Sequence, residues 1–92
     1  MLSGPLDGKT WAFEQEITIG RDEAVAEACI TLDRYISRRH AQLRDEGKGL
    51  VLRDLSSRNG TRIGNAPVDA QTQLAPGGSF VVGRTLLRVR SA

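Results

Sequence analysis

Apolar and polar side chains alternate in short runs along most of this chain. These runs occupy residues 17–19, 30–32, 41–44 and 87–90. A strand with one buried face needs this period of two, because successive side chains point to opposite faces of a sheet. Residues 50–52 and 80–82 are continuous apolar runs, typical of more deeply buried strands, and Trp11 with Phe13 predicts an early strand. The pattern restricts the chain to an all-β fold.

Turn-forming residues separate these runs. They include Gly47, Gly49, Gly64-Asn65-Ala66-Pro67 and Pro76-Gly77-Gly78. Short strands divided by turns at intervals of about 8–12 residues are typical of a β-sandwich or barrel. The pair Asn59-Gly60, between the runs at 50–52 and 61–63, predicts a hairpin turn because both residues tolerate positive φ. Residues 22–28 favour helix in composition but are too few for a stable one, so we expect a helical turn inside a loop.

The size and charge of the chain predict one folded domain with a weak overall electrostatic field. Its 92 residues are too few for two separate cores. The net charge is only +2, so any preference for anions must come from local clustering. Lys9 and Lys48 are the only lysines among 13 basic residues, and the rest are arginines. We expect residues 1–92 to form a single domain, typical of a module cut from a longer protein.

Several classes of site and location are excluded by what the chain lacks. Cys29 is the only cysteine and His40 the only histidine, so neither a disulfide within the chain nor a metal-ligand spacing exists. No Gly-rich run precedes a Lys-Ser or Lys-Thr pair, and no cofactor is expected. The sequence has no apolar run long enough to span a membrane and no signal peptide. We expect a cytoplasmic location and no membrane partner.

Arginine stands beside small, hydrogen-bonding residues at three separate places. The segments are Gly20-Arg21, Ser37-Arg38-Arg39-His40 and Ser57-Arg58-Asn59-Gly60-Thr61. Arginine offers a planar fork of donors that suits phosphate and carboxylate. Together the segments predict one site that binds an anion through several donors.

The pair Ser37 and His40, with Asp33 or Asp54, invites a catalytic interpretation. A nucleophilic site needs these groups in register beside oxyanion donors. Nothing in the sequence resembles a nucleophile elbow, so we expect no catalytic residue and no enzyme activity. His40 is expected instead to brace the Ser37 loop through hydrogen bonds of its side chain.

The ordered set of these segments resembles the forkhead-associated (FHA) domain. The resemblance covers residues 17–21, 36–41, 52–61 and 76–83. It implies an FHA/SMAD-like antiparallel β-sandwich with two sheets and about eleven short strands, with binding loops at one end. It also implies a signalling module that binds a phosphothreonine segment of a partner protein, itself a substrate of a Ser/Thr kinase.

The resemblance assigns roles to individual residues. Arg21 and Ser37 would contact the phosphate with help from Arg38, and Asn59 would hydrogen-bond the peptide backbone. The supporting residues would be Gly20, His40 and Gly60. Arg58 departs from the Thr or Ser that many relatives have there, and it either reaches the anion or points into solvent. Selection of residues near the phosphothreonine is expected from Tyr35, Arg34 and the 64–73 loop.

Two other functions stay open. One is phosphate-independent pairing with a partner, or self-association, through an outer sheet face. The other is nucleic-acid binding by the surplus arginines, which ranks low because one Trp, one Tyr and two Phe leave little for base stacking.

Overall fold

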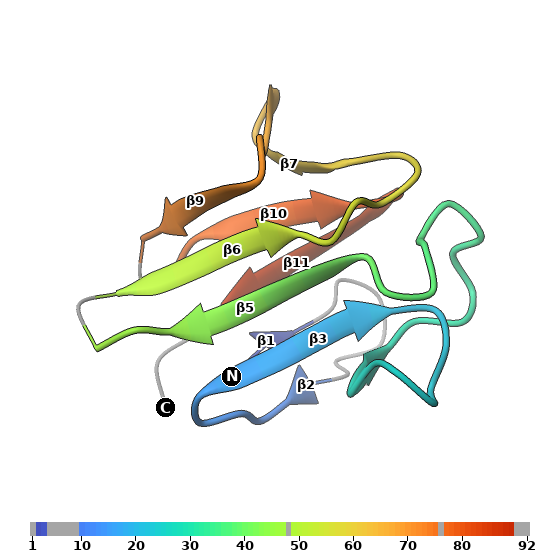
Figure 1. Ribbon diagram of the computed structural model, residues 1–92, viewed down its shortest axis with the longest axis horizontal. Helices are drawn as coiled ribbons and strands as arrows, with labels where there is room; N and C mark the ends of the chain where they lie inside the picture. The colour runs from blue at the N-terminus through green and yellow to red at the C-terminus, as the bar shows by residue number, and fades with distance from the viewer. Residues whose placement is uncertain (1, 4–9, 48, 76, 90–92) are drawn as a thin grey trace.

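The computed structural model describes residues 2–3, 10–47, 49–75 and 77–89, and within them it contains eleven strands and no helix (Figure 1). The strands are β1 (Leu2–Ser3), β2 (Thr10–Trp11), β3 (Glu16–Gly20), β4 (Ala28–Cys29), β5 (Ala41–Asp45), β6 (Leu50–Asp54), β7 (Thr61–Ile63), β8 (Ala66–Pro67), β9 (Gln71–Leu74), β10 (Ser79–Val82) and β11 (Thr85–Val89). No helix among the described residues is long and apolar enough to cross a membrane.

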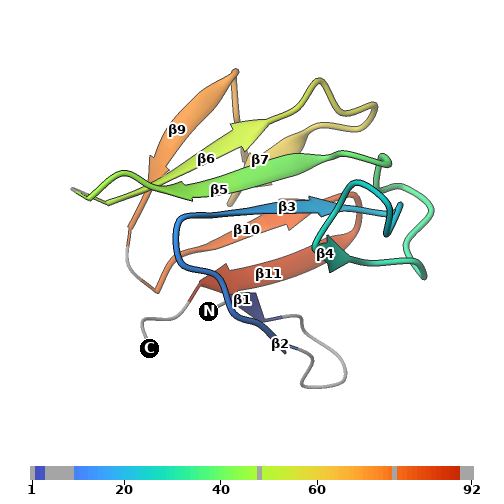
Figure 2. The same cartoon turned by 60° about the horizontal axis from the view of Figure 1, so that its bottom comes forward.

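Two sheets pack face to face as a sandwich, which confirms the predicted fold class (Figure 2). One sheet has six strands in the order β2-β1-β11-β10-β7-β8, and the other has five in the order β4-β3-β5-β6-β9. Every pairing is antiparallel except that of β3 with β4, which is parallel.

The period-two pattern places one row of side chains from each sheet in the core. In the five-stranded sheet, Leu43 lies opposite both Ile17 and Leu52, and all three are at most 1% exposed. In the other sheet, Phe80 lies opposite Leu87, and both are fully buried. Burying one such side chain stabilises the fold by about 1.5–3 kcal/mol. The core therefore fixes the register of the strands and the positions of the loops that they support.

The predicted strand over residues 30–32 is wrong. The strand in this region is β4, which pairs with the last two residues of β3. The Ile30 amide still donates to the Gly20 carbonyl at 2.8 Å, but β3 ends there and offers no further partner. The chain then turns into a loop, where Leu32 is 97% exposed.

Residues 22–26 form the expected helical turn inside a loop. The amides of Val25 and Ala26 both donate to the Asp22 carbonyl, at 3.1 and 3.0 Å. The Asp22 carboxylate also accepts the Ala24 amide at 2.9 Å. The turn is shorter than the predicted segment, because Ala28 already belongs to β4.

Several other predicted boundaries shift by a residue or two. The early strand β2 contains Trp11 but not Phe13, which packs against the core just beyond it. Arg90, at the end of the predicted run 87–90, and Pro76, in the predicted turn 76–78, lie outside the described residues.

The predicted hairpin at Asn59-Gly60 is also wrong. Strands β6 and β7 belong to different sheets, so the segment between them crosses the sandwich. Gly60 has a positive φ of 82°, as a turn glycine should, but the second left-handed residue of this segment is Ser56, with φ 58°. An Asn-Gly pair reports a local turn but not which strands the turn connects.

Loops from both sheets meet at one end of the sandwich. Strands β3, β6 and β10 run toward this end, and β5, β7 and β11 start from it (Figure 1). All three arginine segments therefore lie at the same end of the molecule.

Candidate functional site

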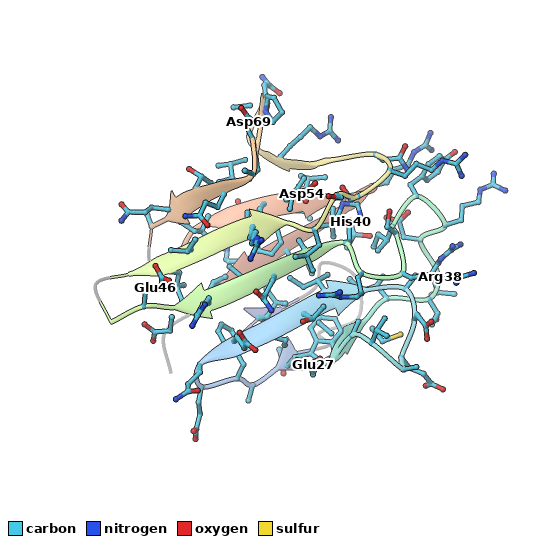
Figure 3. The ribbon with its side chains drawn as sticks, in the orientation of Figure 1. Glu27, Arg38, His40, Glu46, Asp54 and Asp69 are labelled. Carbon is cyan, nitrogen blue, oxygen red and sulfur yellow. The ribbon has the colours of Figure 1, made fainter. Side chains whose placement is uncertain are left out.

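The loop after β4 is joined to the end of β3 through backbone hydrogen bonds. The Arg21 amide donates to the Ser37 carbonyl at 3.1 Å, and the Asp22 amide lies 3.5 Å from the Arg38 carbonyl. Arg38 lies on the loops beyond the strand ends (Figure 3). These contacts place the exposed side chains of Arg21 and Arg38 on one open pocket. Its lining is completed by Asp22, Glu23 and Thr31.

Neither guanidinium in this pocket forms an ion pair within the described part of the chain. The pocket also holds the carboxylates of Asp22 and Glu23, which moderate its positive charge. Arginine donors that are open to solvent and converge on one hollow suit a phosphate or a carboxylate.

Gly20 lets the β3 end and the Arg38 loop approach each other closely. A Cβ atom at Gly20 would stand 1.9 Å from the Arg38 carbonyl oxygen and 3.2 Å from the Ala26 Cβ. Only glycine permits this backbone separation. Gly20 therefore sets the distance between Arg21 and Arg38 in the pocket.

We expect Gly20→Ala to destabilise the domain by about 1–3 kcal/mol, because overpacking forces the backbone to shift. The exposed Arg38 loop must move, so amide resonances of residues 37–39 should shift more than those of the core strands. Urea unfolding and an amide NMR spectrum measure both effects. Unchanged stability with unchanged loop resonances would contradict this account of the close approach.

The His40 ring is fully buried and connects two loops, the one between β4 and β5 and the one between β6 and β7. The Ser37 amide donates to Nδ1 at 3.0 Å, so Nδ1 is an acceptor and the ring proton resides on Nε2. Nε2 then donates to the Gly60 carbonyl at 2.8 Å. The His40 backbone continues the connection, since its amide donates to Ile19 and its carbonyl accepts from Leu55. Figure 3 shows His40 beside Asp54 near the ends of β5 and β6.

Ser37, Arg58 and Asn59 meet across the two loops. The Arg58 amide donates to the Ser37 hydroxyl oxygen at 2.9 Å, and the Asn59 side-chain Nδ2 donates to the Tyr35 carbonyl at 2.8 Å. The Ser37 hydroxyl proton and the Asn59 Oδ1 remain available to a ligand, as far as the described residues show. The Arg58 side chain is exposed, and among the described residues Arg58 joins this network through its backbone amide alone. Arg39 is exposed as well.

Two aspartates that hold these loops were not recognised as supports from the sequence. Asp54 accepts the Ser57 amide, the Ser57 hydroxyl at 2.5 Å and the buried Thr61 hydroxyl at 2.7 Å. Asp33 accepts the Tyr35 amide at 2.9 Å, which is a local turn of a kind that Asp forms often. That turn and the Asp54-x-x-Ser57 spacing are the only sequence signals for these roles.

Asp33 also connects the loop between β4 and β5 to the β10–β11 turn. Its Oδ2 accepts the Arg84 amide at 2.8 Å and the Thr85 hydroxyl at 2.6 Å. Burial by itself would raise the pKa of Asp33. The hydrogen bonds from Thr85, Arg84 and Tyr35, with the charge of Arg84, outweigh burial and hold the pKa below its ordinary value of 3.8.

Because the folded pKa of Asp33 lies below its unfolded value, the stability that its ionised form contributes is fully present above about pH 4. That contribution is lost as the pH falls through the folded pKa.

We expect Asp33→Ala to lower the stability of the domain by about 2 kcal/mol at pH 7, because it removes hydrogen bonds to a charged acceptor. Urea unfolding of the unaltered chain and of Asp33→Ala at pH 7 and pH 3 measures their difference in stability, which should be smaller at pH 3. A difference that widens on acidification would contradict the assignment.

The model of the FHA domain family matches residues 17–83, and the chain belongs to this family. FHA domains are protein-interaction modules. The chain is 43% identical over 58 residues to the FHA domain-containing protein FhaA of Mycobacterium tuberculosis, an alignment that covers 63% of this chain. The aligned part spans only 11% of FhaA.

Solved FHA domains superpose on almost the whole chain. One, from a structural and functional study of phosphothreonine-dependent FHA domain interactions, has a TM-score of 0.86 and 35% identity, covering 99% of this chain and 94% of its own. Another is an FhaA FHA domain in complex with the intracellular domain of a second protein. It has a TM-score of 0.85 and 35% identity, and covers 97% of each chain.

Proposed function

We propose that this chain is a phosphothreonine-dependent protein-interaction module with no catalysis of its own. The observation that carries the proposal is the convergence of Arg21, Arg38 and Ser37 at one loop end. A phosphothreonine brings a charge of about −1.5 to −2 and three strong acceptor oxygens at neutral pH. The forked donors of Arg21 and Arg38 and the Ser37 hydroxyl match those oxygens in charge and in hydrogen-bonding capacity.

The geometry around Ser37 supports its role as a donor. Its oxygen already accepts the Arg58 amide, which orients the hydroxyl so that its proton is free to reach outward. The His40 ring accepts the Ser37 amide, so hydrogen bonds fix both the backbone and the side chain of Ser37. A donor that is already oriented loses little entropy when the anion arrives.

Asn59 supplies the contact to the peptide backbone. Its Nδ2 is used by the Tyr35 carbonyl, and its Oδ1 would accept an amide N–H of the bound segment. The Arg58 backbone amide already donates to the Ser37 hydroxyl oxygen, so we assign it no contact with the ligand. We propose that the exposed Arg58 guanidinium adds to the positive field at the rim of the site.

The energies favour a moderate affinity. Each hydrogen bond to a charged group contributes about 1.5–3 kcal/mol, so three contribute roughly 5–9 kcal/mol before the cost of association. Backbone contacts through Asn59 must supply the rest. We expect a dissociation constant near 1 μM, or about −8 kcal/mol.

Relatives at 35% identity support the choice of ligand. One solved relative comes from work on phosphothreonine-dependent interactions, and another binds the intracellular domain of a second protein. We propose that the partner of this chain is a protein phosphorylated on threonine by a Ser/Thr kinase.

A library of phosphothreonine peptides, probed in parallel with the same peptides unphosphorylated, tests this function. We expect capture only from the phosphorylated set, with a recoverable preference at neighbouring positions. Equal capture from both sets would overturn the proposal and favour phosphate-independent pairing through a sheet face.

A further inference from the structure

Thr31 is an exposed threonine in the pocket that also holds Arg21 and Arg38. The chain has six threonines, and of these only Thr10 and Thr31 are exposed. Thr10 lies in strand β2, whereas Thr31 lies in the loop between β4 and β5. The Thr31 side chain forms no hydrogen bond with another described residue. Its hydroxyl is therefore available for reaction.

The backbone around Thr31 is accessible as well. The Ile30 amide donates to the Gly20 carbonyl, and the next backbone hydrogen bond of this segment is at the Asp33 carbonyl. None joins Thr31 or Leu32 to another described residue, and Leu32 is 97% exposed. A segment with few buried contacts and no backbone hydrogen bonds opens locally at a low free-energy cost. An enzyme that modifies side chains can therefore reach this threonine.

A phosphate group on Thr31 would lie among the donors of its own pocket. Arg21 and Arg38 line this pocket, and neither guanidinium forms an ion pair within the part of the chain that the structure describes. Phosphorylation adds a charge of about −1.5 to −2 and three strong acceptor oxygens. Hydrogen bonds from guanidinium groups to phosphate are roughly twice as strong as neutral ones. The two arginines suit a phosphate on the chain itself as well as one on a partner.

The carboxylates of the pocket do not remove this complementarity. Asp22 and Glu23 offset part of the positive charge. The Asp22 carboxylate already accepts the Ala24 amide at 2.9 Å, within its own helical turn. An ionised carboxylate accepts hydrogen bonds but cannot donate them. The charged donors that a phosphate needs are therefore those of the two arginines.

We infer that Thr31 is a phosphorylation site, and that its phosphate occupies the pocket of Arg21 and Arg38 and excludes a phosphothreonine partner. The phosphoryl donor is a nucleoside triphosphate bound to a Ser/Thr kinase. The Thr31 Oγ1 attacks the γ-phosphorus, the bond from that phosphorus to the bridging oxygen of the diphosphate breaks, and the hydroxyl proton passes to a base of the kinase. The inference rests on the proposed function, because the partner must use the same donors.

The internal phosphate has the advantage of being attached to the pocket. A group held by a short tether acts at an effective concentration of about a millimolar. A partner phosphate must displace this group, and the charges of the two phosphates also repel each other. We expect phosphorylation of Thr31 to weaken binding of a phosphothreonine peptide at least about tenfold.

The test incorporates phosphothreonine at position 31 during synthesis of the chain, and at position 10 in a matched control. Thr10 is also exposed, but β2 is joined through β1 to the end of β11 that is remote from the binding loops. Calorimetric titration should show the tenfold loss with phosphate on Thr31 and a change within about twofold with phosphate on Thr10. No loss at position 31, or an equal loss at both positions, would overturn the inference.

A panel of Ser/Thr kinase catalytic domains, supplied with ATP, tests the modification itself. Mass spectrometry should place a phosphate on Thr31. The treatment should weaken peptide binding by the unaltered chain but not by Thr31→Val, when each is compared with its own untreated sample. If no kinase of the panel modifies Thr31, it is not a phosphorylation site.

NMR resonances of the arginine Nε–H groups separate this inference from the proposed function. Phosphate on Thr31 should shift the resonances of Arg21 and Arg38, and phosphate on Thr10 should not. Such shifts support the internal contact even if no phosphothreonine peptide binds the unmodified chain, in which case the proposed function alone fails. If peptides bind the unmodified chain but phosphate on Thr31 shifts neither arginine, the inference alone is overturned.

Discussion

Arg21→Ala should weaken binding of a phosphothreonine peptide by about 30- to 1,000-fold. The fork of its guanidinium is proposed to give one of the three charged interactions with the phosphate, and the loss of that interaction together with the charge corresponds to about 2–4 kcal/mol. The fold should be unaffected, because the side chain is exposed and the Arg21 amide keeps its bond to Ser37. Calorimetric titration gives the affinity, and thermal unfolding checks the stability.

Two variants distinguish the fork of Arg21 from its charge. Arg21→Lys keeps the charge but cannot donate two parallel hydrogen bonds, so it should recover only part of the lost affinity. Arg44→Ala lowers the net charge by the same amount as Arg21→Ala, and its loss should stay within about threefold at physiological salt. Equal losses for Arg21→Ala and Arg44→Ala would show that the effect is one of general charge.

His40→Ala should cost about 3–4 kcal/mol of stability, the largest expected effect on the fold itself. The substitution leaves a cavity at a fully buried position and removes the partners of the Ser37 amide and the Gly60 carbonyl. Because both loops lose their connection, peptide affinity should fall even under conditions where the domain stays folded. Urea unfolding gives the stability, and titration at low temperature gives the affinity.

Two substitutions separate the two hydrogen bonds of the ring. His40→Asn can offer an acceptor near the Nδ1 position, and His40→Gln can offer a donor near Nε2. His40→Asn should preserve the hydrogen bond from the Ser37 amide. It should therefore retain more of the peptide affinity than His40→Gln does. A cost below about 1 kcal/mol for His40→Ala would contradict the role of the ring as a connection between loops.

The strands were predictable from the sequence because each is a local pattern. The alternation at 17–19 and 41–44 marks strands β3 and β5, and the continuous run at 80–82 marks β10. The predictions that were wrong concern segments whose structure depends on partners distant in sequence. Residues 30–32 alternate but have no strand to pair with once β3 ends, and the segment before Thr61 crosses between sheets.

The order of Arg21, Ser37 and Asn59 predicted a common site, and the fold places all three at one loop end. The supports of that site were not predictable to the same extent. Asp33 bonds the Arg84 amide, which lies 51 residues further along the chain. No local pattern predicts that contact, because it exists only once the β10–β11 turn is brought to the site by the packing of the two sheets.

The most direct test of phosphothreonine recognition is a calorimetric titration of one matched peptide pair, identical except for the phosphate. We expect a dissociation constant near 1 μM for the phosphothreonine peptide. The unmodified peptide should bind at least about 100-fold more weakly, because the hydrogen bonds to the charged phosphate are lost. The same affinity for both peptides would contradict phosphothreonine-dependent recognition by this chain.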